Sequence, residues 1–238
     1  MGFFGFFRGS EERNIKKHAA RVANKRSQNP ERWESIKALS AIPRPEAVEA
    51  LLQRFSFRID PSISDQEEKE AVLEGIVKIG EPAIEPVTCY LKTSESIAWP
   101  IRILSRLVDE QKVTAELLAL LEEMDTEYER DPEKKREILA ELANRKAPEI
   151  AGAVKRFTED VNEACRFHAF DALFAQDEPL DAEYLSDALR REESMRVRAR
   201  ILDAMAANDI ALVGSVPEGS LPVGYFFFKD GKVSKPKL

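Results

Sequence analysis

The strongest constraint on the fold of this chain is an apolar pattern that recurs roughly every 33 residues. Five mostly apolar stripes with the spacing i, i+3, i+4, i+7 begin at Val48, Ile84, Leu117, Ile150 and Ala182. Successive stripes start 36, 33, 33 and 32 residues apart. This spacing places the four side chains of each stripe on one face of a helix. A period in the thirties is typical of proteins built from repeated supersecondary units.

A second apolar series lies between these stripes, as pairs of residues three positions apart. Its members are Ile36/Leu39, Leu73/Ile76, Leu104/Leu107, Leu139/Leu142, Phe170/Leu173 and Leu202/Met205. Two interleaved helical patterns indicate a helical hairpin that is repeated along the chain. We expect an N-terminal helix near residues 11–26 and repeats that begin near residues 30, 65, 95, 131, 161 and 194, the sixth without a full second helix.

Helix start signals accompany both series. Prolines suited to a first helical turn precede three second-helix stripes, at Pro45, Pro82 and Pro148. Capping side chains are expected before three first helices, at Asn29, Asp65 and Asp131. Glu68 stands three residues after Asp65, the reciprocal position of a capping box.

The repeat pattern breaks after residue 213. Gly214, Pro217, Gly219 and Pro222 follow, and then Asp230-Gly231 stands between aromatic residues and a valine, which predicts a hairpin with a two-residue turn. The end repeat of a solenoid must cover a face that has no neighbour, so we expect this hairpin to pack on the last repeat. The predicted organisation is a Phe-rich tip at 1–10, repeats at 11–213 and a cap at 214–238.

The stretch KIGEPAIEPVTCYLK, residues 78–92, resembles HEAT repeats of the bacterial type that also occur in phycobilisome lyases. The whole chain is similar to a family of bacterial HEAT-repeat proteins, through RFSFRIDPSISDQEEKE, AWPIRILSRL, EYERDPEKKR and LPVGYFFFKDGKV. The resemblance implies an all-α fold, an α-solenoid of about six HEAT-like hairpins with an N-terminal helix and a C-terminal β-hairpin cap. It implies interaction with other proteins and brings no catalytic residue.

Charge and composition narrow the function classes. The net charge is −7, but residues 1–26 carry +5 and residues 229–238 carry +3, which leaves −15 in the body between them. An acidic body repels phosphate backbones, so we expect no nucleic-acid binding. We interpret the two cysteines, Cys89 and Cys165, as small buried hydrophobic residues of a reducing compartment. A spanning apolar run and the features of a signal peptide are both missing, so we expect a cytoplasmic protein.

Candidate metal and catalytic groups are sparse. Cys165 and His168 share a helical face and would supply two zinc ligands, whereas a closed site needs four. The acidic stretch 122–133 lacks the central glycine of a calcium loop. We therefore predict no catalytic, cofactor-binding or metal-binding residue and no cofactor. The alternative class is an enzyme like HEAT-type DNA glycosylases or chromophore lyases, which would need a basic aromatic groove or a reactive cysteine or histidine at an open pocket.

The second helices are expected to line one curved surface that binds an unidentified protein partner. The candidate contact residues between the stripe positions are Glu49, Gln53, Glu85, Lys92, Lys155, Arg156, Asp187 and Arg191. The connection RFSFRIDPSIS, residues 54–64, has two interpretations: packing on neighbouring helices, which we favour, or a docking ledge flanked by Arg54 and Arg58. We expect Trp99 in the core.

Four phenylalanines crowd the first seven residues, at Phe3, Phe4, Phe6 and Phe7. Leaving four such side chains in water is unfavourable, so they need a cover. We expect first a lid on the first repeat, second insertion into a partner, and third contact with a membrane beside the basic helix. Gly2, Gly5 and Gly9 weaken helix formation in the tip. The predicted function is a non-enzymatic scaffold or adaptor; the alternatives are the enzyme class above and a peripheral membrane adaptor.

Overall fold

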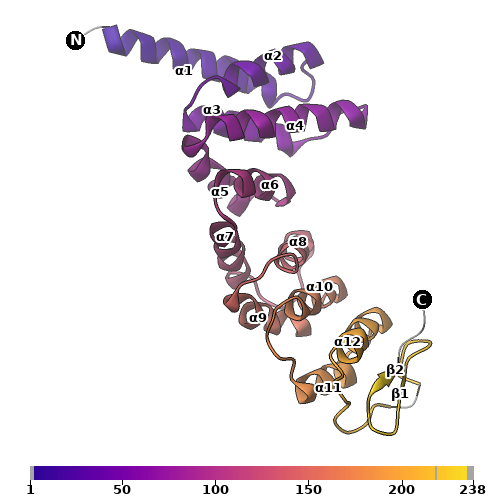
Figure 1. Ribbon diagram of the computed structural model, residues 1–238. Coiled ribbons are helices and arrows are strands. Elements are labelled where there is room, and N and C mark those ends of the chain that lie inside the picture. The colour runs from indigo at the N-terminus through magenta and orange to yellow at the C-terminus, as the bar shows by residue number, and fades with distance from the viewer. Residues whose placement is uncertain (1–2, 218, 235–238) are drawn as a thin grey trace. The chain divides into compact units, whose positions relative to one another are not determined.

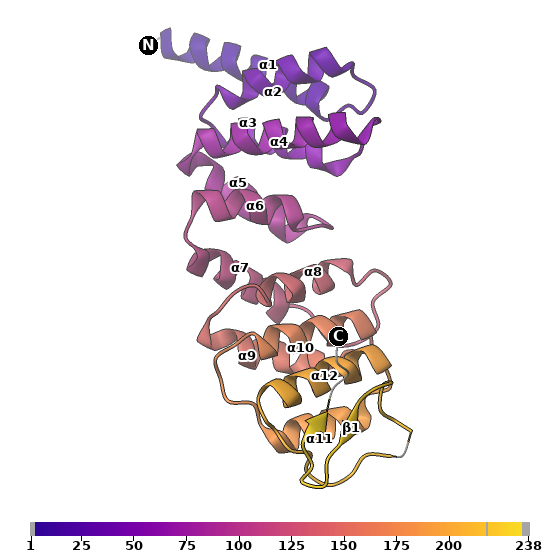
Figure 2. The same ribbon diagram turned by 45° about the vertical axis from the view of Figure 1, so that its right-hand side comes forward.

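The fold is all-α apart from one small hairpin (Figures 1 and 2). The computed structural model describes residues 3–217 and 219–234, and the side chains from residue 11 onward within these ranges. Over these residues it has twelve α-helices and a two-stranded sheet. The chain forms two compact units, residues 1–113 and 114–238. The predicted all-α helical-repeat fold with a short C-terminal hairpin is confirmed.

The first unit is a stack of helical hairpins behind an N-terminal helix. Its helices are α1 (Phe3–Val22), α2 (Asn29–Ser40), α3 (Pro45–Leu52), α4 (Ser62–Ile79), α5 (Ile84–Thr93) and α6 (Ala98–Leu107), with short 3-10 turns η1 (Gln53–Ser56) and η2 (Glu81–Ala83). First helices pack on first helices, α2 on α4 and α4 on α6, while α3 packs on α5. The stripe residues Val48, Leu51, Val87 and Leu91 are fully buried in this core, as the periodicity predicts.

The second unit repeats this arrangement. Its elements are α8 (Glu133–Leu142), α9 (Pro148–Lys155), η3 (Arg156–Glu159), α10 (Glu163–Phe174), α11 (Ala182–Arg191), α12 (Met195–Ala207), β1 (Phe226–Phe227) and β2 (Val233–Ser234). Helix α7 (Glu110–Glu122) spans the boundary between the units. First helices again pack together, α8 on α10 and α10 on α12. Tyr225, Phe227 and Val233 of the cap pack on the core of the last repeat, so the predicted cover is confirmed.

The repeat positions agree with the sequence periodicity. First helices begin at residues 29, 62, 98, 133, 163 and 195, each within three residues of its predicted start, and no second helix follows α12 within the described residues. The N-terminal helix differs, since α1 begins at Phe3 and ends at Val22. Its backbone continues through Gly5 and Gly9, because adding a residue to an existing helix costs little compared with nucleating one. It ends early where Asn24 Oδ1 accepts a hydrogen bond from the Arg26 N–H at 2.9 Å.

Two of the three predicted side-chain caps are wrong. Asn29 is already inside α2, and Asp65 lies in the first turn of α4, so Glu68 forms no capping box. Asn29 instead donates a hydrogen bond to Glu68, and both Asp65 and Glu68 accept hydrogen bonds from Arg54. Asp131 does accept from the N–H of Glu133 at 3.2 Å, just before α8. Pro45 and Pro148 begin α3 and α9 as predicted, whereas Pro82 lies in η2, directly before α5.

The C-terminal hairpin has a longer turn than predicted. Phe226 pairs with Ser234 and Phe227 with Val233. The Phe228 N–H then donates to Lys232 O, and the Gly231 N–H donates to Phe228 O, both at 2.9 Å. The loop therefore has three residues, and Gly231, at φ +79°, takes the left-handed conformation that such a loop needs.

Candidate functional site

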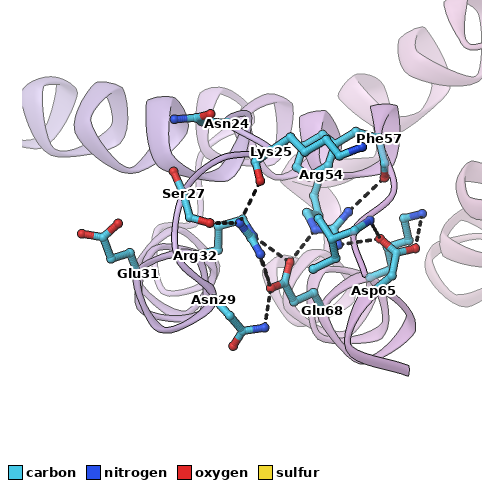
Figure 3. Close-up of polar contacts among 12 residues, drawn as sticks. Asn24, Lys25, Ser27, Asn29, Glu31, Arg32, Arg54, Phe57, Asp65 and Glu68 are labelled. Carbon is cyan, nitrogen blue, oxygen red and sulfur yellow. Dashed lines mark hydrogen bonds and ion pairs between the residues drawn. The ribbon is translucent and has the colours of Figure 1, made fainter. Parts of the chain in front are cut away.

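The most concentrated polar cluster of the first unit surrounds Glu68 on α4 (Figure 3). Its carboxylate lies between two guanidinium groups, that of Arg32 from α2 and that of Arg54 from η1. Arg32 Nε donates to Glu68 Oε2 at 3.0 Å, and Arg54 Nε donates to the same oxygen at 2.7 Å. Asn29 Nδ2 donates to Oε1 at 2.9 Å. One carboxylate thus links α2, η1 and α4.

Asp65 extends this cluster by one turn of α4. Its Oδ1 accepts from Arg54 NH2 at 2.8 Å and from the Ile59 N–H at 3.0 Å, and Lys69 Nζ donates to Oδ2 at 2.7 Å. Burial raises the pKa of the Asp65 carboxyl, but the hydrogen bonds from Lys69, Arg54 and the Ile59 backbone outweigh it, so the pKa lies below its ordinary value. Asp65 is therefore ionised at neutral pH.

The charged centre of the Glu68 cluster, formed by Arg32, Arg54 and Glu68, is buried inside the unit. The side chains of Arg54 and Glu68 are 0% exposed and that of Arg32 is 4% exposed. Arg54 also donates to Phe57 O at 3.1 Å, and its guanidinium lies 4.6 Å from the Phe57 ring centre. The ledge interpretation of residues 54–64 is therefore wrong for Arg54, which holds the connection in place. The cluster links neighbouring repeats, and its Arg32, Arg54 and Glu68 side chains are closed to a ligand.

In the second unit, separate ion pairs between neighbouring elements take the place of a cluster like that of Glu68. Lys135 of α8 lies 2.8 Å from Asp160 Oδ2, and Arg166 of α10 donates to Glu192 with both its Nε and NH2 at 2.8 Å. Each pair ties a first helix to the segment that follows a second helix. Burial raises the pKa of Glu192, but the Arg166 hydrogen bonds outweigh this effect and lower it below the ordinary value. These pairs are structural as well.

Aromatic residues around the first connection are only half-buried. The Trp99 ring stacks on Phe55 with centroids 5.0 Å apart, and the Arg102 guanidinium lies 4.6 Å from the Trp99 ring centre. The prediction that Trp99 lies in the core is therefore wrong. Trp99 lies at the start of α6, where one face of its ring contacts Phe55 and the Arg102 guanidinium covers part of the remaining ring surface. The predicted packing of Phe55, Phe57 and Ile59 fits their half-buried state.

The cysteines and histidines occupy contrasting environments. Cys165 is buried, as predicted, and burial raises the pKa of its thiol to about 12. Cys89 is exposed on α5, so its predicted burial is wrong; it lies outside the stripe that packs into the core. Burial lowers the pKa of His168, and His18 Nδ1 lies 3.0 Å from Ser35 Oγ. Among the described side chains, no three His, Cys, Asp or Glu residues gather as metal ligands would.

The predicted contact residues of the second helices reach the surface in both units. Glu49, Gln53, Glu85 and Lys92 are exposed on the first unit, and Lys155, Arg156 and Arg191 on the second. Asp187 is half-buried beside Arg190.

Three of the residues in the second unit are held by intramolecular contacts. Lys155 Nζ lies 4.5 Å from the Tyr184 ring centre, and Arg191 donates to Glu159 at 2.7 Å. Arg156 donates to three carbonyls at the end of α7, including Leu121 O at 2.8 Å. The eight residues therefore form no single cluster.

An open groove between α2 and α4 was not predicted. It has a volume of about 1020 Å³. Its lining residues are Trp33, Ser62, Ile63, Gln66, Glu67, Glu70, Ala71 and Glu74. It lies on the first-helix side of the unit, whereas sequence reasoning placed the partner surface on the second helices. The available signal was that Trp33 and Ile63 are large apolar residues outside both predicted stripes.

Two further findings concern the ends of the chain and membranes. The side chains of Phe3, Phe4, Phe6 and Phe7 lie outside the described residues, so the interpretations of the Phe-rich tip stay predictions. Over the described residues, the helices fall short of the length and apolar character that crossing a bilayer requires.

No family model, curated protein or solved structure matches this chain. The resemblance to HEAT repeats therefore stays a prediction from sequence.

Proposed function

We propose that this protein is a non-enzymatic scaffold of the HEAT-repeat kind that binds another protein. The observation that carries the proposal is the open groove between α2 and α4, where a large apolar side chain stays in water. Ile63 is 71% exposed there, beside the half-buried ring of Trp33. Apolar surface gathered in a groove is a common mark of a protein-binding site.

Of the cysteines, which are the nucleophiles that a lyase-type reaction would use, Cys165 favours the same proposal. A nucleophilic cysteine needs a lowered thiol pKa and access to solvent, and Cys165 has a raised pKa and is buried. The environment of Cys165 suits a structural residue better than a lyase-type site.

The strongest charge clusters also favour a scaffold. The Glu68 cluster and the Arg166–Glu192 pair hold neighbouring repeats together, so the exposed helical faces have a fixed geometry. A binding surface whose side chains are already ordered loses less entropy when the partner docks.

Affinity capture of the tagged, full-length protein from its native cell tests the proposal. We expect a protein enriched over a tag-only control, and we expect it to bind the purified protein directly. Capture without specific enrichment, or an enriched protein that does not bind in purified form, would contradict the scaffold function.

A further inference from the structure

One end of the groove lies on a part of α4 that extends beyond the start of α6. Helix α4 has 18 residues and α6 has 10. Arg102, in the fifth position of α6, pairs with Glu70, in the ninth position of α4, at 2.9 Å. The first turn of α4 therefore projects beyond the start of α6, as both ribbon views show (Figures 1 and 2). Ile63 lies in this projecting part, without a helix of the next repeat to cover it.

The floor of the groove suits one large apolar side chain. Trp33 contributes an aromatic ring from α2, while Ile63 and Ala71 contribute aliphatic groups from α4. A volume of about 1020 Å³ is ample for a leucine or phenylalanine side chain together with its backbone. Burying such a side chain in an aromatic-lined groove is how most binding hot spots gain their energy.

The rim of the groove is acidic. Glu67, Glu70 and Glu74 follow one another along the exposed face of α4, and no basic residue is among the lining residues. Glu70 and Glu74 pair with Arg102 and Arg106 on the α6 side. Glu67 has no ion-pair partner among the described residues. Exposed pairs of this kind are weak, so their carboxylates stay available to a second cation.

We propose that this groove binds an amphipathic helix of a partner protein, with a large apolar side chain on the floor and lysine or arginine side chains along the Glu67–Glu74 rim. The inference rests on the proposed scaffold function. The rim carboxylates recur at i, i+3 and i+7, so a helix lying along α4 can match them with basic residues at the same spacing. The carboxylates disfavour nucleic acid and anionic lipid as occupants, because both would bring negative charge to this rim.

Tryptophan fluorescence reports directly on the groove. The chain has two tryptophans, Trp33 in the groove and Trp99 stacked on Phe55. A Trp99→Phe variant keeps an aromatic ring on Phe55 and leaves Trp33 as the single reporter. The probe is a synthetic amphipathic peptide of leucine and lysine, compared with an isostructural peptide of leucine and glutamate and with oligolysine. We expect the leucine–lysine peptide to shift the Trp33 emission to shorter wavelength, and the other two to leave it unchanged.

Two matched variants decide whether the groove itself is the site. Ile63→Glu places a charge on the groove floor, and Val223→Glu makes a comparable change at a valine that is 98% exposed in the other unit. Because both side chains are exposed, both variants should keep the wild-type melting temperature. We expect Ile63→Glu to weaken peptide binding by about ten-fold or more, and Val223→Glu to leave it nearly unchanged. Equal affinities of the two variants would overturn the inference, since binding would then follow only the overall acidity of the protein.

The two proposals can fail separately. If cellular capture finds a direct partner that Ile63→Glu retains fully, the scaffold function stands and the groove inference is wrong. If the peptide binds in the groove but no cellular partner is captured, the scaffold function is contradicted while the chemistry of the groove is supported. An emission shift caused equally by the leucine–glutamate peptide would refute the acidic rim as the source of specificity.

Discussion

Glu68→Gln should destabilise the first unit strongly, although the two side chains have nearly the same shape. The carboxylate has both oxygens occupied, Oε1 by Asn29 and Arg32, and Oε2 by Arg32 and Arg54. A glutamine must place its NH2 group at one of these positions, where it meets another donor. The exchange also leaves two guanidiniums, 4% and 0% exposed, without their shared countercharge.

Removing one partner of a buried ion pair costs about 3–5 kcal/mol, and we expect about this loss in the free energy of unfolding. Urea denaturation followed by tryptophan fluorescence measures it, because both tryptophans lie in the first unit. Helical circular dichroism recorded on the same samples shows whether the two units unfold together.

Glu74→Gln is the matched control. The chemical change is the same and Glu74 lies on the same helix, but its side chain is 59% exposed and pairs with Arg106 in solvent. We expect its urea midpoint to stay close to that of the wild type. If Glu68→Gln were as stable as Glu74→Gln, the Glu68 cluster would not hold the repeats together, and our account of the first unit would be refuted.

Three further predictions concern pH, a close helix contact and the thiols. The pKa of Asp65 is lowered in the folded state, so its stabilisation is present above its unfolded pKa of about 4 and is lost as the pH falls through the folded value; Asp65→Asn should flatten the acid limb of stability against pH. Gly75→Ala should lower the melting temperature, because a Cβ there would overlap Ser40 Oγ of α2, and adding Ser40→Gly should restore it; no loss in the single variant would show that α2 and α4 pack less closely than described. Iodoacetamide at neutral pH should label Cys89 in the native protein and Cys165 only after unfolding, as mass spectrometry can measure; native labelling of Cys165 would contradict its burial.

The repeat architecture could be predicted from the sequence because each helix has its own local pattern of apolar residues. Stripe residues such as Val48 and Leu91 recur at helical spacing, and their burial requires only that each helix find the next along the chain. The same locality explains the success of the proline signals at Pro45 and Pro148. The C-terminal hairpin was predicted correctly, but its loop length was not. The loop length depends on the hydrogen bond that the Gly231 N–H donates to Phe228 O.

The polar contacts between repeats could not be predicted in the same way. Glu68 stands at a capping-box position in the sequence, and only the approach of Arg32, from 36 residues away, shows that it is the centre of a buried ion-pair cluster. Ile63 lies beyond the start of α6 because the two helices differ in length and register, which no single stripe encodes. Trp33 and Ile63 signalled the groove weakly, as apolar residues without a place in either stripe. Charge alone predicts that polyanions are disfavoured as partners, because the body carries −15.

The most direct test of the scaffold account is one quantitative capture experiment with three tagged baits, the wild type, Ile63→Glu and Val223→Glu, expressed at native level in the native cell. We predict that the wild type and Val223→Glu enrich the same partner to the same extent, and that Ile63→Glu loses most of it while remaining folded. Equal enrichment by all three baits would contradict the groove as the binding site, and the absence of any enriched partner with the wild type would contradict the scaffold function itself.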